Sequence, residues 1–97
     1  MDKLLYNFFK ELKFDDGEIE TLIEQSPVLE ELSVDEASEN LNILISFGYP
    51  VDDLTYIIAM NPVFLCRNSK ELKNDLKKLA SEYDDIEQAL KNDPFLI

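Results

Sequence analysis

Histidine is absent from this chain of 97 residues, and cysteine occurs once, at Cys66. Catalysis by Ser–His–Asp or Cys–His groups, and every zinc site that uses histidine, are thereby excluded. A lone cysteine cannot form an intramolecular disulfide, which fits a reducing compartment. Because Cys66 lies between Leu65 and Arg67, we expect it to pack at the edge of a core. With only Gly17 and Gly48, the chain also lacks a glycine-rich loop that could hold a phosphate.

Long apolar segments are missing as well. No run approaches the roughly 20 apolar residues that are needed to span a bilayer. The start of the chain, Met1-Asp2-Lys3, has neither the layout of a signal peptide nor the arginine-rich character of a transit peptide. We therefore expect a cytoplasmic protein without a membrane segment. The length and the 45% hydrophobic content are typical of a single globular domain, residues 1–97.

Positive charge is missing from the middle of the chain. Residues 14–66 contain no lysine or arginine, whereas twelve acidic residues lie between Asp15 and Asp53. Five of the nine bases then fall within residues 67–78. The net charge of −12 disfavours a nucleic-acid backbone as a partner, because polyanions repel one another.

What the chain does contain is a pattern that recurs around three prolines. Pro27, Pro62 and Pro94 follow one another at offsets of 35 and 32 residues. Apolar residues at i, i+3 and i+4, the spacing of one helix face, precede each proline. The residue before a proline is biased away from helical conformation, so each helix should end there. The proline can then begin a new short helical turn. The three apolar sets are Ile19/Leu22/Ile23, Leu54/Ile57/Ile58 and Ile86/Ala89/Leu90.

A second helix should follow the first two of these turns. Ser33 with Glu36 has the spacing of a capping box, and Ser69 is expected to cap the corresponding helix of the second copy. A further apolar stripe predicts a leading helix over residues 2–13. No strand-like alternation competes with these patterns. The sequence therefore predicts an all-α fold of tandem helical repeats.

The repeats divide the chain as follows: repeat one at about residues 15–47, repeat two at about 49–81, and a partial repeat three at about 83–97. We expect the apolar faces to form the core. The side chains expected to be buried are Ile19, Leu22, Ile23, Leu54, Ile57, Ile58, Leu72, Leu76, Leu79, Ile86 and Leu90.

Two resemblances follow from these residues. The segment Phe47-Gly48-Tyr49-Pro50-Val51-Asp52-Asp53-Leu54, continued by Pro62-Val63-Phe64-Leu65 and Ser69-Lys70-Glu71-Leu72, resembles the repeat of the mitochondrial transcription termination factor (mTERF) family, in a short acidic form. That resemblance implies two antiparallel helices and a short third helix per repeat, which form a short curved solenoid. It also implies a basic nucleic-acid-binding surface. Separately, Phe47-Gly48-Tyr49-Pro50 before an amphipathic helix is similar to the loop of small ubiquitin-binding three-helix domains.

The charge pattern favours a non-enzymatic binding module with a basic protein surface as its partner, in the extreme form a nucleic-acid mimic. An acidic surface on this chain would contact that partner. The residues expected to form it, which we call the acidic set, are Glu18, Glu20, Glu24, Glu30, Glu31, Asp35, Glu36 and Glu39. The alternative is nucleic-acid binding of mTERF type through a basic segment. That segment comprises Arg67, Lys70, Lys73, Lys77 and Lys78. A ubiquitin-like partner is a further alternative.

No catalytic residue, cofactor, small-molecule substrate or metal site is predicted. Asp15-Asp16-Gly17 and Asp84-Asp85 lack the alternating acids and terminal glutamate of a calcium-binding loop, so we interpret them as helix-start acids. The third repeat stops at residues 94–97 without a second helix, and terminal repeats normally need a polar cap. We expect this tail to fold back over Leu76 and Leu79 in a monomer. The alternative is a dimer through the open edge.

Overall fold

The computed structural model describes residues 3–97, and these residues form helices and connecting loops without a strand. This part of the chain contains six α-helices and four short 3-10 helices. In chain order they are α1 (Lys3–Glu11), α2 (Asp16–Gln25), η1 (Pro27–Glu31), α3 (Val34–Ser46), η2 (Val51–Asp53), α4 (Leu54–Met60), η3 (Pro62–Cys66), α5 (Ser69–Glu82), α6 (Ile86–Asn92) and η4 (Pro94–Leu96). The predicted all-α class is confirmed. None of the helices within residues 3–97 combines the length and the apolar composition that a bilayer crossing requires.

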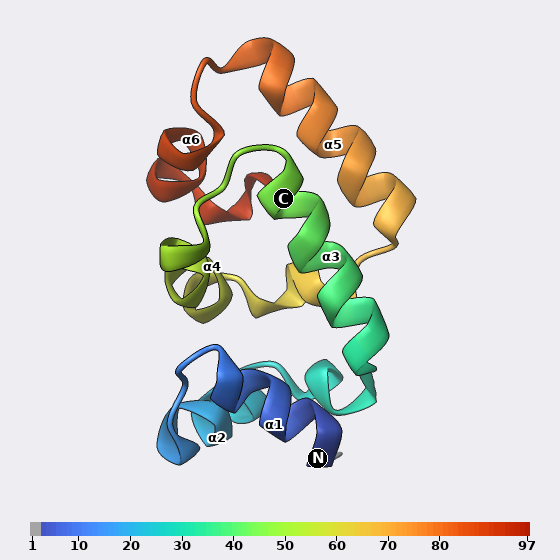
Figure 1. Ribbon diagram of the computed structural model, residues 1–97, viewed down its shortest axis with the longest axis vertical. Coiled ribbons are helices and arrows are strands. Elements are labelled where there is room, and N and C mark those ends of the chain that lie inside the picture. Colours follow the sequence, from blue (N-terminus) through green and yellow to red (C-terminus); the bar gives the residue numbers. More distant parts are fainter. Residues whose placement is uncertain (1–2) are drawn as a thin grey trace.

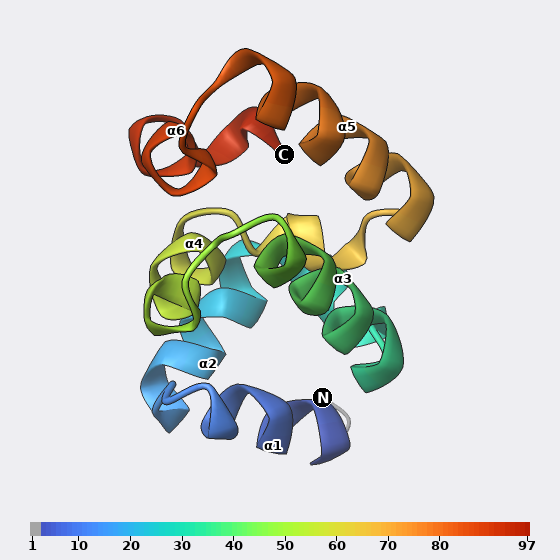
Figure 2. The ribbon, with the colours of Figure 1, turned by 45° about the horizontal axis from the view of Figure 1, so that its top comes forward.

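The helices are arranged along one long axis (Figure 1). The molecule measures 38 × 23 × 20 Å along its principal axes. Helices α1 and α2 lie at one end, α3 and α4 in the middle, and α5 and α6 at the other end. Figure 2 shows α3 and α5 side by side and running in the same direction, with α4 and α6 on the opposite side of the molecule.

Each of the three proline-preceding residues ends its helix in the same way. Ser26, Asn61 and Asp93 have φ values of −138°, −148° and −146° and ψ values of 76°, 71° and 93°. The N–H of each donates to the carbonyl oxygen four residues earlier. Each proline then stands at the start of a 3-10 helix. The predicted helix ends and proline-initiated turns are confirmed by this geometry.

The helix starts differ in part from the prediction. Asp15 and Glu18 form a complete capping box, in which Asp15 Oδ1 accepts from Glu18 N at 2.8 Å and Asp15 N donates to Glu18 Oε1 at 3.0 Å. Ser33 makes only half of one, since its Oγ accepts from Glu36 N without the return bond. Ser69 is not the cap of α5. Asn68 takes that place, because its Oδ1 accepts from the N–H groups of Lys70 and Glu71.

The core is one continuous cluster from Leu5 to Ile97. It runs through the three proline-containing segments, residues 15–47, 49–81 and 83–97, which we call units one, two and three. Ten of the eleven side chains that were predicted to be buried are buried. Ile23 is the exception, because it is only half-buried where its counterparts Ile58 and Leu90 have no exposed surface. The first unit therefore lacks cover on one side that the other two units have.

Two buried asparagines connect neighbouring units. Asn40 of α3 lies with its Nδ2 within 3.1, 3.0 and 2.9 Å of the carbonyl oxygens of Phe64, Leu65 and Arg67, and its Oδ1 accepts from Ser69 Oγ. Asn61 Nδ2 donates to the carbonyl oxygen of Pro94 at 3.0 Å. Because both asparagines are buried, these bonds fix η3 and η4 each against the unit before it.

Both ends of the described chain depart from simple helical patterns. Helix α1 ends at Glu11, before the predicted limit of residue 13, because Lys13 adopts a φ of 77° and the N–H of Phe14 returns to Phe9 O. The predicted first residue, Asp2, lies outside the described residues. At the other end, Ile97 is buried in the same cluster as Leu76 and Leu79, whereas Phe95 is 68% exposed.

Candidate interaction surfaces

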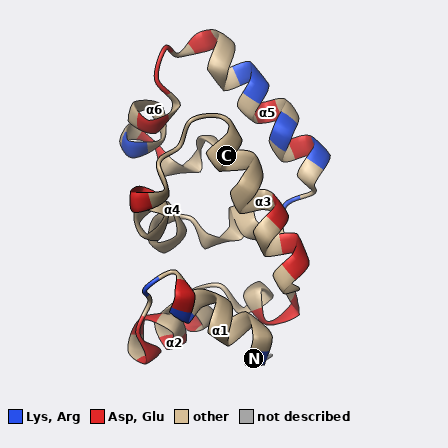
Figure 3. Ribbon diagram, viewed as in Figure 1, with Lys and Arg blue, Asp and Glu red and all other residues tan. Residues whose placement is uncertain are grey.

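The acidic set lies on α2, η1 and α3, and all eight side chains belong to exposed residues. Figure 3 shows acidic segments at the end of the molecule formed by α2 and, separately, on the first half of α3. Within residues 3–97, no member of the set makes an ion pair. The acids therefore stay available to an external partner, but over more than one surface.

Three of the acids meet around one groove, which we call the Tyr6 groove. It has a volume of about 300 Å³ and is lined by residues of α1, α2 and η1. Of its two isoleucines, Ile23 is half-buried and Ile19 is only 2% exposed, and three carboxylates stand beside them. The lining residues are Tyr6, Ile19, Glu20, Ile23, Glu24 and Glu30.

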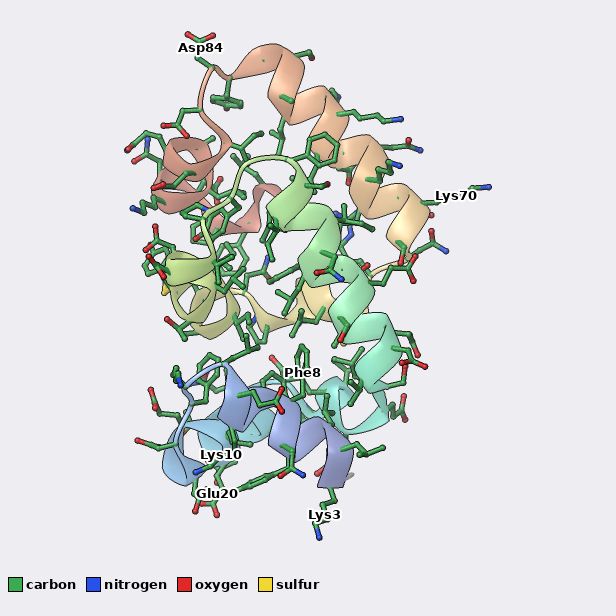
Figure 4. All side chains as sticks on the ribbon, viewed as in Figure 1. Lys3, Phe8, Lys10, Glu20, Lys70 and Asp84 are labelled. Atoms are coloured by element: carbon green, nitrogen blue, oxygen red, sulfur yellow. The ribbon has the colours of Figure 1, made fainter. Side chains whose placement is uncertain are left out.

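Tyr6 is held in place by its hydroxyl. The hydroxyl donates to Asp16 Oδ1, and the same oxygen accepts from Lys10 Nζ at 3.0 Å. The bond to Asp16 raises the pKa of Tyr6 to about 12, and this bond together with Lys10 lowers the pKa of Asp16. Lys10 is thus engaged at Asp16. Figure 4 shows Lys10 and Glu20 at the same end of the molecule as Lys3.

The remaining acids belong to other places. Asp35 and Glu39 line a shallow hollow between α3 and α5, opposite Lys73. Glu31 and Glu36 line a smaller one of about 160 Å³ together with Cys66. Glu18 lines a fourth hollow, near Ala59 of α4, and closes the capping box of α2. The eight acids of the acidic set are thus distributed over four hollows.

Cys66 is half-buried and packs against the core, in agreement with its predicted place at the core edge. Burial raises the pKa of its thiol, and the nearby Glu36 carboxylate adds to the effect. A raised thiol pKa reduces the fraction of reactive thiolate at neutral pH. Burial therefore lowers the reactivity expected of the Cys66 thiol.

We expect the folded protein to react with iodoacetamide at pH 8 at least about tenfold more slowly than the urea-unfolded chain, because alkylation needs the thiolate and access to it. Mass spectrometry over a time course measures both rates on the same chain. Free cysteine in the same two buffers controls for the effect of urea on the reagent. Equal rates in the folded and unfolded protein would contradict the burial argument.

The basic segment is only partly available. Lys70, Lys73, Lys77 and Lys78 are exposed on α5, and Figure 4 shows Lys70 pointing away from the molecule. Arg67 instead faces inward: its Nη2 contacts Asp75 Oδ2 at 2.5 Å and its Nη1 donates to the main-chain oxygen of Ile97 at 2.8 Å. Arg67 thus connects η3 to the end of the third unit and is not part of a free basic surface.

The loop that is similar to ubiquitin-binding domains is turned inward. Tyr49 is 1% exposed and its hydroxyl donates to Asp53 O at 3.1 Å. Burial raises the pKa of Tyr49 to about 12, with a smaller contribution from Asp53. Phe47 is half-buried against the core. The loop therefore presents no fully exposed aromatic side chain.

The acids considered for calcium have structural places within the described residues. Asp15 and Asp85 cap α2 and α6, and Asp84 stands exposed in the preceding loop, where Figure 4 labels it. Over residues 3–97 there is no group of three or more cysteine, aspartate or glutamate side chains arranged to hold a metal ion.

Comparison with protein-family models, with curated proteins and with solved structures gives no match. Both resemblances drawn above thus rest on the residues of this sequence.

The charge pattern of the sequence does not indicate the roles of Tyr6, Ile23 and Asn40. Tyr6 and Ile23 line the groove, although the sequence assigned the first no role and the second to the core. Burial of Asn40 was not predicted either. It stands on the apolar face of α3, three residues after Ala37 and four before Leu44. A polar residue at such a position signals a buried hydrogen-bonding group.

Proposed function

We propose that this chain is a non-enzymatic binding module whose acidic amino-terminal half engages a basic protein surface. One observation carries the proposal: the eight acids of the acidic set are exposed and none is ion-paired within residues 3–97. Charge complementarity speeds encounter and selects partners. In the extreme form, the module occupies a nucleic-acid-binding site of its partner.

The arrangement of the repeats belongs to the same proposal. We infer that the three units stack as a short curved solenoid, as the resemblance to the mTERF family implies. The matching helix ends at Ser26, Asn61 and Asp93 support this, as does the Asn61–Pro94 bond between units two and three. Tyr56 and Asp53 of unit two also bind Lys91 of unit three, and the bond to Asp53 raises the pKa of Lys91. We take the module to act as a monomer, because copies with a net charge of −12 repel one another.

Nucleic-acid binding through α5 is the second candidate. Its support is that Lys70, Lys73, Lys77 and Lys78 are exposed and make no ion pair among the described residues. Against it, the α3 carboxylates of Asp35 and Glu39 share a hollow with Lys73, as the adjoining acidic and basic segments in Figure 3 illustrate. A phosphate backbone on α5 would meet those carboxylates as well.

We expect the protein to bind a labelled lysine-rich peptide and not a labelled DNA duplex at physiological salt, since its field repels polyanions in most directions. Fluorescence anisotropy measures both. The variant K70E/K73E/K77E serves as a control and should leave peptide binding intact. Micromolar duplex binding that this variant abolishes would replace the first proposal by the second.

A further inference from the structure

The Tyr6 groove differs from the equivalent places in the other two units. Glu30 stands in register with Leu65, which is fully buried, and with Ile97, which is 8% exposed. Ile23 stands in register with Ile58 and Leu90, both without exposed surface. At the positions of Ile23 and Glu30, unit one therefore leaves surface exposed that units two and three bury with apolar side chains.

The cover in the other units is visible in their contacts. Asn40 of α3 binds the carbonyl oxygen of Leu65, and Arg67 binds that of Ile97, so a preceding element lies over each of these turns. In unit one, the preceding element is α1, which packs on α2 and α3. It leaves the groove beside Glu30 unfilled, with Tyr6 along its edge.

We propose that the Tyr6 groove binds an arginine side chain presented by a basic protein segment; this rests on the proposed function. The aliphatic stem of arginine packs against Ile23 and its guanidinium reaches Glu20, Glu24 or Glu30. The Tyr6 ring offers a face for the planar guanidinium, which favours arginine over lysine.

The chain's own bases do not supply this group. Lys10 of α1 is bound to Asp16, and no ion pair within residues 3–97 involves Glu20, Glu24 or Glu30. A second copy of the chain would bring a further net charge of −12 toward three carboxylates. A separate, positively charged partner is the occupant that the charges favour.

The test uses the full chain and two labelled probes: a short peptide in which arginine alternates with leucine, and the same peptide with lysine in place of arginine. The variant E24Q/E30Q removes two charges at the groove. The matched control D35N/E39Q removes two charges at the α3–α5 hollow. All four side chains are exposed, so both variants should keep the wild-type unfolding transition.

We expect E24Q/E30Q to weaken binding of the arginine peptide about tenfold or more, and D35N/E39Q, which removes two acids of the same set outside the groove, to weaken it only about twofold. The arginine peptide should also bind more tightly than the lysine peptide. Amide shifts on binding should centre on Tyr6, Ile23 and Glu24. Equal losses of affinity in the two variants would contradict arginine binding in the Tyr6 groove, while the proposal of an acidic binding module would stand. Absence of binding to either peptide would end the proposed function itself.

Discussion

Replacing Asn40 by leucine should lower the free energy of unfolding by about 2–4 kcal/mol, because two or more buried carbonyl groups lose their donor. Asn40 has no exposed surface and is similar in size to leucine, so the loss reflects hydrogen bonding and not a cavity. Its two amide protons are shared among the carbonyl oxygens of Phe64, Leu65 and Arg67. Those carbonyls can only accept, which fixes the orientation of the amide.

Asn42 offers a matched control for this change. It stands two residues further along α3 and is exposed, so Asn42→Leu should change stability by less than about 0.5 kcal/mol. Urea unfolding followed by circular dichroism compares the two variants at the same helix propensity. Similar midpoints for Asn40→Leu and Asn42→Leu would show that Asn40 does not hold η3 against α3.

A second comparison separates the Asn40 amide from its side-chain partner, Ser69. Asn40→Asp keeps the shape but places a carboxylate against three carbonyl oxygens, so it should be at least as destabilising as Asn40→Leu at neutral pH. Ser69→Ala removes only the bond to Asn40 Oδ1 and should cost about 1 kcal/mol or less.

The helices and their ends follow from short-range rules, which is why the sequence predicts them well. Apolar spacing places the buried faces, and the prolines at 27, 62 and 94 end each first helix at the residue before. The cap of α5 could also have been found. The offset of 35 residues that relates Pro27 to Pro62 carries Ser33 onto Asn68, whereas the preference for serine pointed to Ser69.

The packing of the units and the shape of the surfaces depend on contacts between residues far apart in the sequence, which local spacing does not predict. Asn40 reaches partners 24 to 27 residues away, and Asn61 binds Pro94, 33 residues away. The eight acids were predicted as one set from the charge pattern alone. The turns at η1 and before α3 send them in different directions, so only Glu20, Glu24 and Glu30 share the Tyr6 groove. Ile23 is only half-buried there, which helical periodicity cannot indicate.

Leu76→Ala and Ile57→Ala should each cost about 2–5 kcal/mol, because both side chains are fully buried and alanine leaves a cavity. That is a large share of the roughly 5–15 kcal/mol that stabilises a domain of this size. Lys77→Ala, beside Leu76 but exposed, is the control and should shift stability by less than about 0.5 kcal/mol.

The same two variants test whether the three units unfold together. Leu76 belongs to α5 and Ile57 to α4, yet both are part of the one core cluster that continues from Leu5 to Ile97. If the cluster unfolds as a whole, each variant should lower the urea midpoint and leave the denaturant slope unchanged. Units that unfold separately would instead give a reduced slope or two transitions, as repeat arrays do when coupling between neighbours is weak. We expect a single transition, because Asn40 ties η3, and Asn61 ties η4, to the preceding unit, and neither unit can open without breaking those bonds.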